Sequence, residues 1–159
     1  MNRIASAAIA LSVLFALSNT ALAETSAHQD ARTFVAQTQM GRNLPILALS
    51  AAKRTITYAM IVSTLGSADA GRAVSDEINA LLPQYQPKWD ENLAAAYEKS
   101  FSQEELSSLV ADGRASKYAG KVKERQTEVG RDMQSSSEPL LIALITEALN
   151  ATLAKHVPQ

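Results

Sequence analysis

Apolar residues recur at every third or fourth position from about residue 27 to about residue 155, which is the spacing of one face of an α-helix. Nothing in the chain shows the strict alternation of a half-buried strand. The pattern therefore predicts an all-α fold: a single compact bundle of about six helices. The predicted helical segments are 27–40, 45–65, 72–82, one opening at Pro87, one at Ser102, one at Ser116, and 140–155.

Helix-breaking residues mark the expected boundaries. Gly41 is a natural stop for the first helix, and Pro45 suits the first turn of the second. The segment 66–71, with two glycines, predicts a loop, and Pro83 ends the third helix. Residues 135–139, three serines followed by Glu and Pro, predict a break or a kink. The helices at 45–65 and 140–155 are apolar on two sides, so we expect them to be deeply packed.

The clearest helix start lies in the middle of the chain. Ser102 is a favourable N-cap, and Glu105 three residues later completes a capping box. Glu104 and Glu105 place negative charge in the first turn, where the helix dipole stabilises it. Leu106 and Leu109 then begin an apolar stripe. This stretch predicts a structural role and contains no arrangement typical of catalysis.

The N-terminus has the three parts of a secretory signal peptide. A basic start ending at Arg3 precedes an apolar run over residues 4–17, and Ala21-Leu22-Ala23 forms a small-x-small cleavage site. A transmembrane anchor is the alternative, but the run is shorter than the ~20 residues that a span needs. We expect cleavage after Ala23, an all-helical domain over 24–159, and a periplasmic location in a bacterium.

Composition narrows the classes of function. The chain has no cysteine, which excludes disulfides, thiolate metal sites and thiol nucleophiles. Its formal charge is -1, and removing Arg3 with the signal peptide leaves 14 bases against 16 acids. This net charge offers no electrostatic argument for nucleic acid or an anionic membrane surface. Lys53 and Arg54 interrupt the longest later apolar stretch, so we expect no integral span in the mature protein.

The segment FSQEEL at 101–106 resembles a secreted, all-helical bacterial family known as domain of unknown function 2059. The hallmark of that family is a phenylalanine, a Ser or Thr, and a Glu-Leu pair that opens a helix, here Phe101, Ser102, Glu105 and Leu106. A serine and a glycine follow at fixed spacing, here Ser116 and Gly120. The resemblance implies an exported helical domain and no particular activity.

Few residues suggest a reactive site. His28 and His156, with Asp30 or Glu24, could form a weak metal site if the termini adjoin, but solvated ends are the simpler interpretation. No Gly-x-Ser-x-Gly motif is present to support a serine hydrolase triad. We therefore expect no catalytic residues, no metal and no cofactor.

Carboxylate pairs are the remaining candidates for chemistry. The pairs are Glu104/Glu105, Glu91/Glu98 and Asp76/Glu77. Each could serve acid/base hydrolysis of glycosidic bonds, yet solvated helix faces explain them as well. The basic run of Lys117, Lys121, Lys123 and Arg125 likewise suggests an ordinary exposed helix.

Arg54 falls within an otherwise apolar stripe of the second helix. Two interpretations are open: an arginine whose stem covers the edge of the core, or a buried ion pair with an acid from another helix, for which Glu105 is the candidate.

The sequence leaves three alternative hypotheses for the function. The first is a non-enzymatic interaction or structural module of the cell envelope that binds an unknown protein partner. The second is a carrier or chaperone that holds an apolar ligand or chain between helices, which a cavity of several hundred Å³ would favour. The third is an envelope hydrolase that uses a carboxylate pair.

Overall fold

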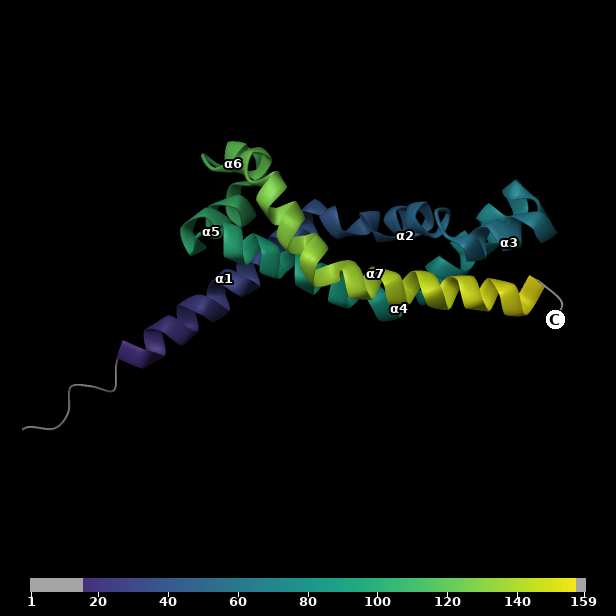
Figure 1. Cartoon of the computed structure of the whole chain (residues 1–159). Helices are drawn as coiled ribbons and strands as arrows, with labels where there is room; N and C mark the ends of the chain where they lie inside the picture. The colour runs from purple at the N-terminus through teal and green to yellow at the C-terminus, as the bar shows by residue number, and fades with distance from the viewer. Residues whose placement is uncertain (1–15, 157–159) are drawn as a thin grey trace, which may run out of the picture.

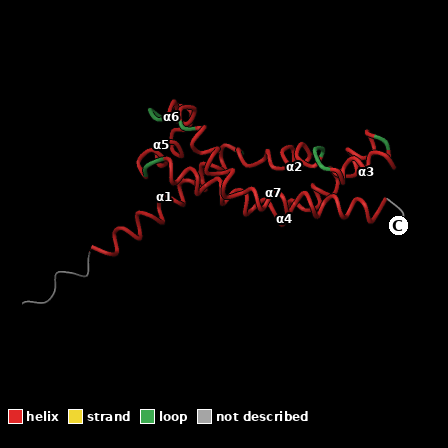
Figure 2. Tube along the Cα trace, viewed as in Figure 1, coloured by secondary structure: helices red, strands yellow, loops and turns green. Residues whose placement is uncertain are grey.

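The computed structural model describes the backbone of residues 16–156 and the side chains of residues 26–156. Within that range every element is helical, so the predicted all-α fold is confirmed (Figures 1 and 2). The elements are α1 (Ala16–Thr38), the 3-10 helix η1 (Met40–Asn43), α2 (Leu44–Ala52), α3 (Ile56–Leu65), α4 (Ser67–Ser100), α5 (Gln103–Asp112), the 3-10 helix η2 (Gly113–Ala115), α6 (Ala119–Glu124) and α7 (Gln126–His156).

Two long helices, α4 and α7, pack side by side and form the centre of the molecule (Figure 1). The second half of α1 packs against α4 and α5 at one end, while α2 and α3 pack against α4 and α7 toward the other. The first turns of α1 extend away from the other helices (Figure 1). Most of the predicted signal peptide lies outside the described residues, and the predicted cleavage point after Ala23 falls within α1.

The first two predicted boundaries are shifted. α1 ends at Thr38, and Gln39 adopts a left-handed backbone with φ 56°, so the helix ends before Met40 and Gly41. The predicted helix 45–65 is two helices, α2 and α3, which meet at an angle of 81°. Thr55 stabilises the break: it has an extended backbone, and its hydroxyl caps α3 by accepting a hydrogen bond from the Tyr58 N–H at 3.1 Å.

Contrary to the sequence prediction, Pro83 does not end a helix and Pro87 does not begin one; at 135–139, where a break or a kink was predicted, the helix is not broken. α4 continues through Pro83 and Pro87, which joins the predicted third and fourth helices, and α7 continues through Pro139. All three prolines are exposed, so water can bind the carbonyl groups that lose their N–H partners. The opposite face of α4 buries Ile78 and Trp89, and this packing offsets the cost of the prolines.

Other helix boundaries also differ from those predicted from the sequence. The loop predicted at 66–71 is limited to Gly66, with φ 81°, because α4 begins at Ser67. The helix predicted from Ser116 begins at Ala119 and ends at Glu124, and α7 begins at Gln126. α7 changes direction between its N-terminal and C-terminal halves, and Pro139 lies in the middle of this helix (Figure 1).

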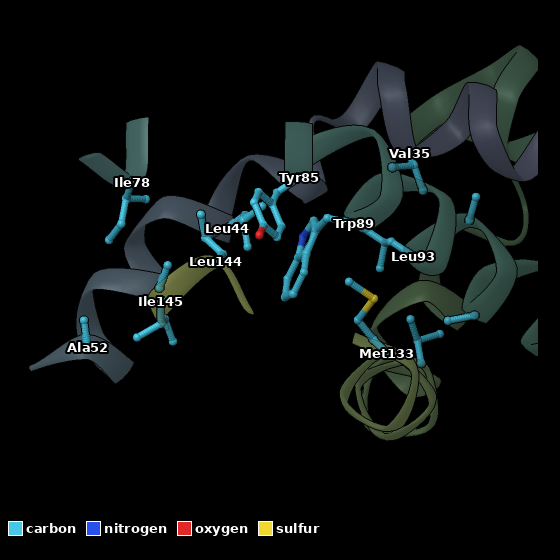
Figure 3. Close-up of a cluster of buried hydrophobic side chains, with 14 of the residues drawn as sticks. Val35, Leu44, Ala52, Ile78, Tyr85, Trp89, Leu93, Met133, Leu144 and Ile145 are labelled. Atoms are coloured by element: carbon cyan, nitrogen blue, oxygen red, sulfur yellow. The ribbon is translucent and has the colours of Figure 1, made fainter. Parts of the chain in front are cut away.

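The core is continuous along α4 and α7. Figure 3 shows Trp89 in its middle, with Leu44 and Tyr85 on one side and Leu93 and Met133 on the other. On α7, the two predicted stripes are buried at Leu144, Ile145, Ala148 and Leu149. Ile142, which the sequence also predicts to be packed, is 56% exposed.

Candidate functional site

The predicted capping box of α5 is confirmed and belongs to a larger cluster. The Ser102 hydroxyl accepts from the Glu105 N–H at 3.3 Å, and Glu105 Oε2 accepts from the Ser102 N–H at 2.9 Å. Glu105 also binds Lys121 Nζ at 2.5 Å through Oε1 and an Arg125 guanidinium nitrogen at 2.9 Å through Oε2. Glu105 is only 7% exposed, so a nearly buried carboxylate joins the start of α5 to the region of α6.

The electrostatics of Glu105 follow from these contacts. Burial alone would raise the pKa of its carboxyl group, because the charged form loses hydration. Hydrogen bonds from Lys121, the Ser102 N–H and Arg125 outweigh burial and lower the pKa to about 2. Glu105 is therefore a permanent anion near neutral pH, which suits an ion pair and not a proton donor.

The remaining motif residues pack around this cluster. Phe101 is buried against Tyr97, and the Arg125 guanidinium lies over the Phe101 ring at 4.9 Å and donates to the Ser100 carbonyl. Leu106 is fully buried in the core.

Ser116 and Gly120 lie beyond α5. The buried Ser116 hydroxyl accepts from the Tyr118 N–H at 3.1 Å and lies 2.8 Å from the Ser108 hydroxyl, so it stabilises a turn and not the start of a helix. At Gly120, a Cβ would have no atom within 4 Å, so packing does not require glycine there.

The predicted ion pair of Arg54 with Glu105 is wrong. The break between α2 and α3 places Arg54 in an exposed turn, which removes it from the apolar stripe. Lys121 and Arg125 hold Glu105 instead, so the basic run is not simply a solvated face. Lys117 pairs with Glu104 at 3.2 Å, whereas Lys123 is exposed.

A second charged cluster joins α1 to α4 around His28. Its Nδ1 lies 2.5 Å from Glu98 Oε2, and its Nε2 lies 2.7 Å from Glu91 Oε1. Arg32, one turn further along α1, binds Glu91 through two nitrogens at 2.7 and 2.8 Å. The hydrogen bond to Glu98 raises the pKa of His28 against the opposing effect of burial, and Glu91 raises it further. The hydrogen bond from Arg32 lowers the pKa of Glu91.

This arrangement corrects the interpretation of His28 and of Glu91/Glu98 as solvated. His156 lies exposed at the end of α7, far from α1, so the two histidines do not meet (Figure 1). Among the described residues no group of three His, Asp or Glu side chains could hold a metal ion. A sequence signal for the cluster exists: His28 and Arg32 share one face of α1, and Glu91 and Glu98 share one face of α4.

Several carboxylates of the predicted pairs bind groups on other elements. The pKa of Glu104 is lowered, first by the Tyr118 hydroxyl at 2.6 Å and then by Lys117. Glu77 binds Lys155 Nζ at 2.6 Å, which ties the start of α4 to the end of α7. In each pair at least one carboxylate is engaged in a contact between elements of the fold.

Grooves lie between several of the described helices, and two of them are large enough to bear on binding. The first, of about 410 Å³, lies between α2, α4 and α7 and has Leu47, Trp89, Met133 and Leu141 among its walls. The Trp89 indole N–H at this groove is buried and has no acceptor among the described residues. The second, of about 490 Å³, lies between α1, α5 and the region of α6, with Phe34, Leu109 and Arg114 among its walls.

The largest exposed apolar side chains lie mainly on α2 and α3. Ile46 is 71% exposed, Leu47 40%, Ile56 82% and Met60 55%, and we call these four residues the α2–α3 face. Sequence reasoning assigned Leu47, Ile56 and Met60 to a packed helix, because periodicity cannot show which apolar side a neighbour covers. No single helix within residues 16–156 is long and apolar enough to cross a membrane; η1 and α2 reach that apolarity only when combined with α3 across the 81° bend.

The comparisons with known proteins leave the family open. No protein-family model matches the chain, and no curated protein or solved structure matches it. The likeness to domain of unknown function 2059 therefore stays a prediction that rests on Phe101–Leu106, Ser116 and Gly120.

Proposed function

We propose that this protein is a non-enzymatic interaction module of the bacterial cell envelope, exported by its N-terminal signal peptide, and that it binds through the α2–α3 face. The observation that carries the proposal is the exposure of Ile46, Ile56 and Met60 on adjacent short helices. Large apolar side chains that gather on one surface mark interaction sites more often than scattered ones do.

The charged clusters support the same proposal, because their contacts are between helices of the fold. Glu105 joins α5 to Lys121 and Arg125, and His28 joins α1 to Glu91 and Glu98. These groups hold helices together, so their presence is explained without a reaction. The likeness at residues 101–106 to a secreted helical family fits an envelope location.

A carrier of an apolar ligand is the second candidate, favoured by the groove at Trp89. Its volume of about 410 Å³ is within the range of small-molecule sites, and Leu47, Met133 and Leu141 provide apolar walls. The Trp89 N–H at this groove has no acceptor among the described residues, so a polar atom of a ligand would give it one.

Photo-crosslinking in intact cells tests the interaction module. A photoreactive residue at position 46 or 56 should give discrete crosslinked products, because these side chains are exposed on the proposed surface. Position 123 on α6 is the control, since Lys123 is also exposed but remote from α2 and α3. Equal, diffuse products from all three positions would refute the proposed surface. The mass of the periplasmic protein would at the same time test processing after Ala23.

Native mass spectrometry of the protein purified from the periplasm without detergent separates the two candidates. Extra mass that denaturation releases would favour the carrier. The Leu141→Trp variant should then lose that mass, because the larger side chain would fill the groove. A bare protein mass would count against a retained ligand.

A further inference from the structure

Charge is unevenly distributed along the chain, and the segment that carries the α2–α3 face is basic. No acid occurs between Asp30 and Asp69, and this stretch contains Arg32, Arg42, Lys53 and Arg54. The rest of the chain carries 11 bases and all 16 acids. The net charge, which offers no argument for an anionic partner, therefore hides a local basic segment that coincides with the exposed apolar one.

All four bases are exposed, and three of them are close in the chain to the exposed apolar residues. Arg32 is engaged with Glu91, but Arg42, Lys53 and Arg54 form no ion pair among the described residues. Lys53 and Arg54 occupy the turn between α2 and α3, so they lie between Leu47 and Ile56 in the chain. Arg42 precedes Ile46 by one turn, in η1.

The bent backbone of α2 and α3 is better suited to lying along a membrane surface than to crossing a membrane. The inner sides of α2 and α3 are anchored in the core by Leu44, Ala52, Tyr58 and Ile61. The 81° bend gives two short helices that can both lie along a plane, with the basic turn between them. Helices at a membrane interface combine apolar side chains that enter the acyl boundary with Lys and Arg that face lipid phosphates.

We propose that the α2–α3 face docks on an anionic phospholipid bilayer, with Ile46, Ile56 and Met60 entering the interface and Arg42, Lys53 and Arg54 facing the lipid phosphates. This inference rests on the proposed function and names the partner of its surface. A second copy of the chain fits the surface less well, because its own segment 31–68 carries the same cations and no acid to pair with them. A neutral apolar partner would leave three cations without counterions.

Vesicle sedimentation tests the proposal with protein exported by its own leader and purified from the periplasm. The two probes are vesicles of phosphatidylethanolamine with phosphatidylglycerol and vesicles of phosphatidylcholine alone. Binding to the anionic vesicles should be at least about tenfold stronger, because each basic residue near an anionic surface contributes about 1 kcal/mol. The difference should shrink as salt is added. Equal binding to both vesicles, or no binding, would overturn the inference.

Variants locate the contact on the molecule. Lys53→Gln with Arg54→Gln should weaken binding to anionic vesicles at least about tenfold. Lys123→Gln with Arg131→Gln is the matched control, because it removes two exposed cations from elsewhere and should leave binding nearly unchanged. Likewise, Ile56→Ser with Met60→Ser should weaken binding, whereas Ile142→Ser on α7 should not. Helical circular dichroism confirms that each variant is folded. Equal effects of target and control pairs would contradict the docking surface.

The outcomes separate this inference from the proposed function. Discrete protein crosslinks from positions 46 and 56 without vesicle binding would refute the lipid partner and retain the interaction module. Vesicle binding that the α2–α3 variants do not weaken would refute the docking surface. If the protein gave no discrete crosslinks and also did not bind vesicles, both proposals would be refuted.

Discussion

At the scale of single residues, the sequence identified the capping box of Ser102 and Glu105 but not the partners that complete it. Capping depends on residues three positions apart, so it is visible in the sequence. Lys121 and Arg125 reach Glu105 only because the chain reverses direction through η2 and the Ser116 turn. Arg54 shows the converse: a helical wheel placed it on an apolar stripe, and the break at Thr55 removed it.

Replacing Glu105 should change the acid stability of the protein. Its pKa is lowered from 4.5 to about 2 in the folded state, so its stabilising effect is present above about pH 5 and is lost as the pH falls toward 2. Glu105→Gln should therefore lower the free energy of unfolding near pH 7 by about 1–3 kcal/mol and flatten its decline between pH 5 and 2. Urea unfolding at several pH values measures both effects.

Glu104→Gln is the control for this change, because the neighbouring carboxylate has a largely exposed side chain. Its effect on the free energy of unfolding should be clearly smaller. A loss equal to that of Glu105→Gln would show that charge at the start of α5, and not the contact with Lys121 and Arg125, accounts for the stability.

At the scale of elements, the existence and approximate positions of the helices were predictable, and their continuity was not. Local signals predict a helix end at Pro83, a helix start at Pro87 and a break or a kink at 135–139, but packing on the opposite face keeps α4 and α7 continuous. The segment 45–65 shows the opposite error, because apolar residues at helical spacing on both sides of Lys53 and Arg54 predicted one helix, yet the chain turns at 53–55. Propensity yields to tertiary packing in both cases.

The contribution of the α3 cap to the free energy of unfolding can be measured separately. Thr55→Ala removes the hydroxyl that accepts from the Tyr58 N–H, so the free energy of unfolding should fall by about 1 kcal/mol. Thr64→Ala is the matched control, since the exposed Thr64 hydroxyl donates only to the Met60 carbonyl within the same helix. If the two variants lose equal stability in urea, the cap does not determine the turn between α2 and α3.

At the scale of the whole molecule, the all-α fold was predictable and the location of the candidate surface was not. Helical periodicity shows that α2 and α3 carry apolar residues on more than one side. Only the placement of α4 and α7 decides that Leu44 and Ile61 are covered while Ile46 and Ile56 remain exposed. The acid-free stretch from 31 to 68 was readable in the sequence, but its meaning depends on that placement.

The length of α4 has a consequence for the local unfolding of the protein. One end of α4 packs with α2, α3 and the end of α7, and its other end packs with α1 and with residues near α5 and α6. We therefore expect two cooperative units that exchange amide hydrogens at different rates, because opening one end leaves the contacts of the other intact. Thr55→Ala should accelerate hydrogen exchange in α2, α3 and the start of α4 and leave α1 and α5 unchanged. A uniform acceleration would mean that the 34-residue helix transmits every local loss through the entire molecule.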